Sequence, residues 1–358
     1  MKRIDWYIIR KFLSTFFFIL GIIMLIAVIF DVSEKLDDFL KHNTPIGEIL
    51  LDYYLNFVLY FGNLFSSLLI FISVIIFTSQ MASKTEIVAI LSSGVSFRRM
   101  LLPYFVAGTF LAIGSLLLNH YVIPRANKQR LAFEELYIRS KFQNRDKNIH
   151  RRINDNDVIY FYRYNADRNV GQKFSLEHWE NDVLTYKLSA DFLKWDSTRQ
   201  GWTIENYVAR TIHPDGEVLT RGQQIDTVFN FKPIDFERRL NTTETMDANE
   251  LDAFIDQERE KGSENIPTYL ITKYQRTSYP FATYVLVLIG ASIASRKVRG
   301  GIGLHIVLGL LVAVSYILMM KVTTVYATNA GLDPLLAVWL PNIIYGVLSL
   351  IILQRAPK

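Results

Sequence analysis

Six long apolar segments constrain this chain of 358 residues more than any other feature. A helix needs roughly 20 mostly apolar residues to cross the hydrocarbon core of a bilayer. The segments that meet this requirement lie at about residues 12–30, 55–78, 100–123, 279–294, 302–320 and 335–353. A long polar stretch separates the first three from the last three. The sequence therefore predicts six membrane-spanning helices in a three-plus-three arrangement.

The charged residues make up 20% of the chain, so they must be segregated from these apolar segments into parts that face water. A net charge of +5 would suit a nucleic-acid partner, but the basic residues are scattered rather than gathered on one face. We therefore expect no nucleic acid. The absence of cysteine excludes disulfides and thiolate sites.

The distribution of Lys and Arg predicts the orientation in the membrane, because short cytoplasmic loops are enriched in basic residues. The short loops at one set of helix ends, at about 31–54 and 322–334, contain only two basic residues, Lys35 and Lys41. We therefore expect both termini in the cytoplasm and the long polar stretch outside. The basic residues at the other set of helix ends are Lys2, Arg3, Arg10, Lys11, Lys84, Arg98, Arg99, Arg296, Lys297, Arg299, Arg355 and Lys358.

The outer segment, residues 124–272, is long enough to form a domain between a first helical part, 1–123, and a second, 273–358. Runs rich in aromatic and β-branched residues alternate with turn signals, which predicts an antiparallel sandwich or a barrel-like sheet. A capping pattern at 247–262 predicts one short helix after the strands. The predicted strands lie at 157–164, 173–179, 183–195, 201–212 and 224–232.

The alternation of side chains places several apolar residues of these strands on common faces. Phe174 and Leu176 share one face, and Ile225, Phe229 and Phe231 share another. Two interpretations are open: an ordinary core, or a groove that holds acyl chains.

The loop between the second and third apolar segments predicts an amphipathic helix at about 81–96. Ile87, Ile90 and Leu91 form its apolar face, Glu86 is its single acid, and Gly94 ends it. Such a helix docks on a partner protein or lies on the membrane surface. A membrane-surface helix usually carries more basic residues than this one, which favours the protein partner.

Several motifs of enzymatic chemistry are missing from the sequence. It has no G-x-x-x-x-G-K-[ST] phosphate loop, no H-E-x-x-H and no G-x-S-x-G, and its six histidines are far apart. We therefore predict no catalytic residue, no metal site and no nucleotide site in this chain.

Four stretches, in this order and spacing, resemble the LptF/LptG family of lipopolysaccharide-export permeases over essentially the whole chain. Residues 81–96 resemble the helix that docks on the ATPase in this family, the coupling helix. The four stretches are TEIVAILSSGVS with Glu86, Ala89 and Gly94; HYVIPRAN at 120–127; the segment from Lys273 to Gly301 with Arg276, Pro280 and Gly300; and GLDPLLAVWLPN at 331–342.

This resemblance implies a permease subunit of an ATP-driven lipopolysaccharide exporter in the inner membrane of a Gram-negative bacterium. It implies six transmembrane helices with a periplasmic β-jellyroll between the third and fourth. The lipid would leave the outer leaflet through a gate lined by the first and fifth spans, then pass to the jellyroll and to jellyroll bridge proteins in the periplasm.

The resemblance also implies the partners. A second permease of the same family pairs with the chain, and two copies of a cytosolic ATP-binding-cassette ATPase dock on the coupling helices. ATP and magnesium belong to that ATPase, so this chain binds no cofactor. The residues implied in docking are Glu86, Ala89, Gly94 and Arg98.

A phosphorylated glycolipid requires cations near the outer ends of the spans, since cation–phosphate hydrogen bonds are charge-assisted. The alternative to phosphate binding is that these long side chains only anchor the helices, by extending their charged ends to the membrane interface. Lys321 is the strongest single candidate because it follows an almost charge-free fifth span. At the outer end of the first span, where permeases of this family can carry a basic residue, this chain has Asp31 instead. The candidates are Lys35, Lys41, Arg125, Lys128, Arg130, Lys273, Arg276 and Lys321.

An alternative function is a mechanotransmission or scaffold subunit that is coupled to an ATPase without moving lipid. It would need the helix at 81–96, but neither outer cations nor an apolar groove.

Overall fold

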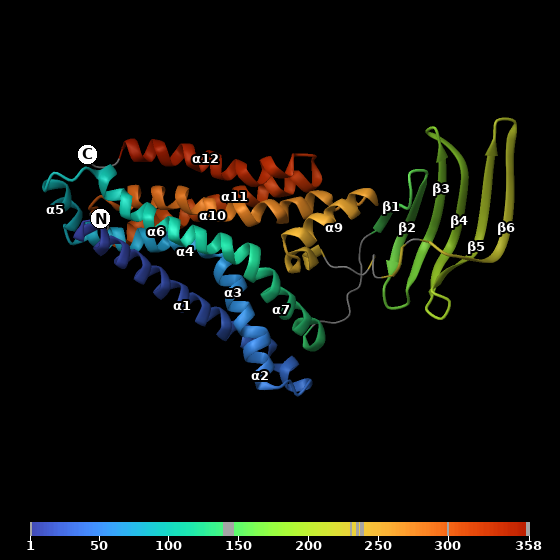
Figure 1. Cartoon of the computed structure of the whole chain (residues 1–358), viewed down its shortest axis with the longest axis horizontal. Helices are drawn as coiled ribbons and strands as arrows, with labels where there is room; N and C mark the ends of the chain where they lie inside the picture. The colour runs from blue at the N-terminus through green and yellow to red at the C-terminus, as the bar shows by residue number, and fades with distance from the viewer. Residues whose placement is uncertain are drawn as a thin grey trace. The chain divides into compact units, whose positions relative to one another are not determined.

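The computed structural model describes residues 2–138, 147–229, 231–233, 236, 240–298 and 301–355. The chain forms two compact units (Figure 1). The helical unit comprises Met1–Ile138, Thr243–Ala248 and Pro267–Lys358, and the β unit comprises Arg139–Thr242 and Asn249–Ile266.

Six helices among the described residues are long and apolar enough to cross a membrane, the same number of candidate spans that the sequence predicts. Two π-helical segments, Ile49–Tyr54 and Leu118–Val122, join shorter helices into longer ones. The helices of this unit are α1 (Arg3–Lys41), α2 (Ile46–Glu48), α3 (Leu55–Leu64), α4 (Ser66–Ser83), α5 (Glu86–Ser92), α6 (Phe97–Leu117), α7 (Ile123–Tyr137), α10 (Ile266–Ala294), α11 (Gly301–Asn329) and α12 (Pro334–Gln354).

Two boundaries differ from the sequence-based expectation. The helix that begins at Phe97 continues to Tyr137, past the expected boundary at 123, because Pro124 lies in the first turn of α7, where proline is tolerated. The second predicted span is interrupted at Phe65, between α3 and α4. The segment Thr243–Ala248, which follows the strands, belongs to the helical unit.

Burial is uneven among the spanning helices. Most of α4 and α10 is buried, whereas most of α1 and α11 is not. The core therefore surrounds α4 and α10, while α1 and α11 present apolar side chains to lipid or to another protein. The start of α1 and the end of α12 lie at the same end of the helical unit as α5 (Figure 1).

Close packing and polar contacts join α11 to its neighbours. A Cβ atom at Gly309 would overlap Cδ1 of Ile75, so the two helices approach closely there. One turn away, Nδ1 of His305 lies 2.7 Å from Oγ of Ser79. The hydroxyl of Tyr316 donates to Oδ1 of Asn342 over 2.9 Å and so joins α11 to α12. Small residues and interhelical hydrogen bonds of this kind hold helices together in membranes.

The β unit contains one antiparallel sheet of six strands, each paired with its neighbours in the sequence (Figure 1). A second sheet, which a sandwich or jellyroll would require, is not among the described residues; the jellyroll stays a prediction. The strands are β1 (Lys147–Arg152), β2 (Asp157–Asn165), β3 (Val170–Glu180), β4 (Val183–Asp196), β5 (Gly201–His213) and β6 (Gly216–Thr227).

An aromatic core covers one face of this sheet. After β6 the chain returns to the sheet and packs Phe231 and Phe236 against Phe161. Nε1 of Trp202 donates to the carbonyl oxygen of Phe231 over 3.0 Å, which fixes the returning segment. The predicted short helix is α9 (Ala248–Glu260), and its Glu258 forms an ion pair with Arg151 of β1 at 2.7 Å.

The last predicted strand ends earlier than expected. β6 stops at Thr227, so the two-residue alternation does not continue to Phe231. Ile225 is 42% exposed, whereas Phe231 is buried in the core, and the expectation that they share a face was wrong. β1 was not predicted, because its sequence KNIHRR contains one apolar residue.

We expect Gly309→Leu to lower the free energy of unfolding by about 1–3 kcal/mol, because the added side chain overpacks the contact with Ile75. The matched control is Gly303→Leu on the same helix, since nothing lies within 4 Å of a Cβ placed there. Thermal unfolding in detergent, followed by circular dichroism, measures the difference. Equal unfolding midpoints for the two variants would contradict the close approach of α4 and α11.

Candidate functional site

The short helix α5 occupies the part of the chain that the sequence predicts to bind a partner. It lies between two backbone positions with positive φ, Thr85 at 61° and Gly94 at 85°. These left-handed residues reverse the chain direction, and glycine adopts that conformation without strain. Ile87 is buried in the core of the helical unit and anchors α5, while Val88 is exposed. The helix therefore has one face packed on the bundle and one face free.

The predicted docking residues differ in their surroundings. Ala89, Gly94 and Arg98 are exposed. Glu86 is half-buried and turned towards α1: the Tyr7 hydroxyl donates to Oε2 of Glu86 over 2.8 Å, and Nζ of Lys11 lies 3.3 Å from the same oxygen. Lys11 also donates to the Tyr7 hydroxyl over 2.9 Å, so the three side chains form a closed cluster.

A second ion pair holds the beginning of α6, beyond the other end of α5. Both Nη atoms of Arg99 donate to the carboxylate of Asp5, over 2.8 and 2.7 Å. Asp5 is only 3% exposed and also accepts from the backbone N–H of Lys2. Sequence analysis missed this pair, because its members are far apart in the chain. A cavity of about 460 Å³ opens between α1 and α5 and is lined by Arg3, Ile4, Tyr7, Glu86, Ala89 and Ile90.

Of the eight predicted phosphate-binding cations, Lys35, Arg130 and Arg276 form the following contacts with groups of this chain. Lys35 pairs with Asp31 at 2.7 Å and also donates to the Tyr53 hydroxyl. Asp31, which departs from the family pattern, is therefore the ion-pair partner of Lys35, one helical turn away. A lysine already paired in this way is less available to a phosphate.

Arg130 is buried and forms an ion pair with Glu134, and its guanidinium lies 4.8 Å from the centre of the Tyr60 ring. Arg276 donates to the carbonyl oxygens of Thr243 and Met246, over 2.9 and 2.8 Å. Both arginines therefore hold parts of the helical unit together.

The remaining candidates are more accessible. Lys273 is half-buried, whereas Lys41, Arg125, Lys128 and Lys321 are exposed. These four exposed cations fit a role in binding an external anion better than the paired ones do.

A polar cluster that sequence analysis missed surrounds Glu244, in the segment that follows the strands. Its carboxylate accepts from the Tyr60 hydroxyl over 2.8 Å and from Nδ2 of Asn127 over 3.0 Å. Next to it, Nδ2 of Asn63 donates to Oδ1 of Asn119 over 2.7 Å. A cavity of about 110 Å³ lies among these groups. The cluster ties the Thr243–Ala248 segment to the helices of the same unit.

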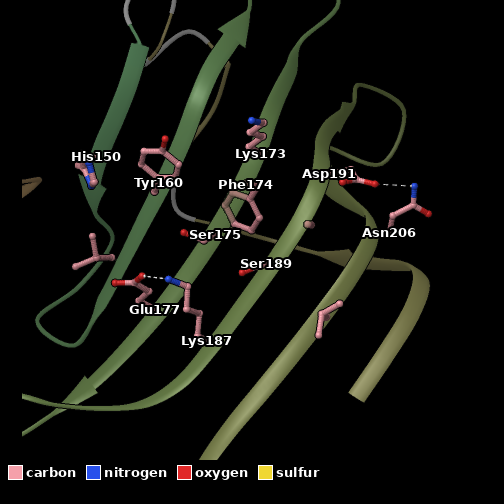
Figure 2. Close-up of a pocket in the computed structure, with 13 residues that line it drawn as sticks. His150, Tyr160, Lys173, Phe174, Ser175, Glu177, Lys187, Ser189, Asp191 and Asn206 are labelled. Carbon is pink, nitrogen blue, oxygen red and sulfur yellow. Dashed lines mark hydrogen bonds and ion pairs between the residues drawn. The ribbon is translucent and has the colours of Figure 1, made fainter. Parts of the chain in front are cut away.

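In the β unit, a cavity of about 580 Å³ opens on the sheet (Figure 2). Its walls include an ion pair between Glu177 and Lys187 at 2.7 Å and a hydrogen bond from Asn206 to Asp191 at 3.1 Å. These residues alternate with core residues along the strands, so most of the lining belongs to the polar face of the sheet.

The predicted acyl-groove residues lie in three kinds of surroundings. Phe174 and Phe231 are buried in the aromatic core, although Phe174 also reaches the cavity of Figure 2. Leu176 and Phe229 are half-buried at the edge of that core, and Ile225 is exposed. The structure thus brings four of the five together. Among the described residues, no group of three or more His, Asp or Glu side chains could hold a metal ion.

These features define a class: a polytopic membrane protein with six candidate spans, a β domain inserted between them, and a short helix, α5, with one exposed face. A family model described as lipopolysaccharide export system permease LptF/LptG matches residues 6–355. The chain belongs to this family, whose members are permeases for lipopolysaccharide. In the comparison with curated proteins, none matched the chain.

His178, on the same strand as Phe174 and Leu176, has a perturbed pKa. Its Nδ1 lies 2.6 Å from Oδ1 of Asp157, and its Nε2 lies 3.4 Å from Glu180. The hydrogen bond to Asp157 raises the pKa of His178 most, and Glu180 adds to the effect. A raised pKa in the folded state means that protonated His178 stabilises the fold. That stabilisation is complete below pH about 6.5 and is lost as the pH rises through the raised pKa.

We expect Asp157→Asn to lower the pKa of His178 and to remove this part of the pH dependence of stability. Histidine NMR of the full chain in nanodiscs measures the titration, with His178→Gln to assign the signal. Asp155→Asn is the control, because Asp155 is exposed just before β2 and is not among the groups that raise the pKa of His178. An unchanged His178 pKa in Asp157→Asn would contradict the assigned cause.

Proposed function

We propose that this chain is a permease subunit of an ATP-driven lipopolysaccharide exporter. It takes the lipid from the outer leaflet of the inner membrane and passes it to a periplasmic jellyroll bridge. The observation that carries this proposal is the family match over residues 6–355, on a chain with six candidate spans and an inserted β unit. The chain itself does not hydrolyse ATP; that reaction belongs to a separate ATPase dimer, which binds ATP and magnesium.

The proposed ATPase docks on the exposed face of α5. Val88 and Ala89 lie on that face, and Arg98 is exposed just beyond the Gly94 turn. The start of α1 and the end of α12 lie at the same end of the unit, as expected if both termini are cytoplasmic (Figure 1). We propose that this end faces the cytoplasm and that the β unit lies in the periplasm.

The proposed lipid path uses the two spanning helices with the least buried surface, α1 and α11. Their exposed apolar side chains suit both acyl chains and a second permease subunit of the same family. Lys41 follows the span in α1, and Lys321 lies in the second half of α11. At those positions, exposed ammonium groups would bind lipid phosphates by charge-assisted hydrogen bonds. Arg125 and Lys128, at the start of α7, extend this set of cations.

The proposed transfer to the β unit involves the edge of its aromatic core. Leu176 and Phe229 are half-buried there, so an acyl chain can reach them without displacing a buried ring. Phe174 and Phe231 lie deeper, and an acyl chain that reached them would have to enter the core.

The composition of the native complex tests this function. We expect the tagged chain, purified from its own cells in mild detergent, to carry a second permease subunit, two ATPase copies and bound lipopolysaccharide. Native mass spectrometry of the intact complex measures both stoichiometry and retained lipid. An ATPase complex without lipopolysaccharide would contradict export and favour a scaffold subunit.

Neutralising Lys321 tests the proposed phosphate contact. We expect Lys321→Gln to weaken lipid stimulation of ATP hydrolysis about two- to fivefold, because an exposed ion pair contributes about 1 kcal/mol or less. The measurement is the ATPase rate of the reconstituted complex as lipopolysaccharide is titrated. Lys297→Gln is the matched control, since Lys297 is exposed just before the opposite end of α11. Identical titration curves for the two variants would exclude Lys321 from the lipid site.

A further inference from the structure

The cavity on the polar face of the sheet has no part in the lipid path proposed above (Figure 2). We propose that this cavity, the polar hollow, binds an acidic sugar ring of a glycan. Its volume of about 580 Å³ lies within the range of roughly 300–1,000 Å³ that is typical of small-ligand sites. Only the source of the glycan rests on the proposed function, since a lipopolysaccharide carries sugars on its lipid.

Two serines on neighbouring strands create the polar hollow. The register places Ser175 of β3 opposite Ser189 of β4, and both line the cavity. Tyr160 of β2 lies opposite Ser175 on the other side. Two residues further along the same face, Glu177 and Lys187 form their ion pair. The serine side chains are too short to fill the space between these larger neighbours, so a depression remains.

The floor of the polar hollow offers hydroxyl groups that are free to bind a ligand. Ser175 is only 8% exposed, and within the described part of the chain neither its hydroxyl nor that of Ser189 forms a hydrogen bond. A serine hydroxyl donates one hydrogen bond and accepts others. It can therefore pair with a sugar hydroxyl in either direction.

One wall of the polar hollow is aromatic. The rings of His150 on β1 and Tyr160 on β2 lie 4.9 Å apart between their centres. The Tyr160 hydroxyl donates to Oδ1 of Asn148 over 2.8 Å, which holds the ring in place. A sugar ring has an apolar C–H face and a rim of hydroxyls. It can pack on this wall while its hydroxyls reach the serines, which is the usual combination of apolar and polar contacts in a ligand site.

Charge at one end of the polar hollow favours an acidic sugar. Lys173 is exposed, its Nζ lies 5.1 Å from the centre of the Tyr162 ring, and it has no acidic partner among the described residues. Its ammonium group can bind a carboxylate or phosphate through charge-assisted hydrogen bonds. Asp191 accepts from Asn206 at this end, and its remaining lone pairs can accept from sugar hydroxyls.

The same lining disfavours other occupants. An acyl chain would bury the ion pair of Glu177 and Lys187 and the serine hydroxyls without replacing their contacts with water, which is unfavourable. A polyanion such as nucleic acid would meet the carboxylates of Glu177 and Asp191. A single acidic sugar places one negative charge near Lys173 and hydroxyls elsewhere, and so suits both ends.

Binding of lipid-free glycans to the full chain in nanodiscs tests the site. The probes are the glycan released from lipopolysaccharide by mild acid, which carries acidic groups, and neutral chitotetraose. Ser189→Leu fills the polar hollow, and Lys173→Gln removes its ammonium group. Ser197→Leu and Arg168→Gln are the matched controls, because both residues are exposed on turns of the β unit and lie outside the lining. Saturation-transfer NMR of the glycan measures affinity, and thermal unfolding verifies the fold of each variant.

We expect the acidic glycan to bind the unmodified chain and Ser197→Leu equally, and Ser189→Leu to abolish binding because leucine occupies the space of the sugar. Lys173→Gln should weaken binding of the acidic glycan about two- to fivefold relative to Arg168→Gln, since an exposed charge pair contributes little. Chitotetraose should bind more weakly than the acidic glycan and be insensitive to Lys173→Gln.

Three results would overturn the proposal: no binding of the acidic glycan to the unmodified chain, equal binding by Ser189→Leu and Ser197→Leu, or chitotetraose binding as tight as that of the acidic glycan. Failure of the proposed function has a separate signature. A native complex without lipopolysaccharide, in a chain that still binds the free glycan, would contradict export and leave the sugar site standing with another glycan as its source.

Discussion

The helical unit depends on one constraint: in a bilayer, the backbone must satisfy its own hydrogen bonds, so the spanning segments are helices. Apolar contact alone does not hold such helices together, since lipid is equally apolar. Close packing at Gly309 and hydrogen bonds such as Tyr316 to Asn342 supply the specificity instead. The first contact joins α11 to the buried helix α4, and the second joins α11 to α12. Most of the remaining surface of α11, like that of α1, is free and apolar.

The predicted phosphate-binding cations occur in two kinds of surroundings. Arg130 pairs with Glu134, and Arg276 donates to two carbonyl oxygens, so both hold parts of the helical unit together. The exposed cations, such as Lys41 and Lys321, cost nothing to keep in water and remain open to an external phosphate. Burial thus separates cations with a mainly structural role from those suited to bind lipid.

The sequence predicted those features that local patterns determine, and missed those that depend on distant partners. Segment length was enough for the spanning helices, and aromatic alternation was enough for β2 to β5. Alternation failed at Ile225, because the strand ends before Phe229. The pair Asp5 and Arg99 gave no local signal, since 94 positions separate its members. For Glu86 the position on a short amphipathic helix was predictable, but its contacts with α1 were not.

The continuous helix α1 connects two polar clusters of the helical unit. The helix runs without proline from Arg3 to Lys41, about 58 Å at 1.5 Å per residue. Near its start, α1 packs through Phe12 on Phe77, with the ring centres 5.3 Å apart, and its Tyr7 and Lys11 contact Glu86 of α5. Near its end it carries Lys35, paired with Asp31 against Tyr53. Because both clusters lie on one uninterrupted helix, a displacement of α1 near α5 would also move the pair of Lys35 and Asp31.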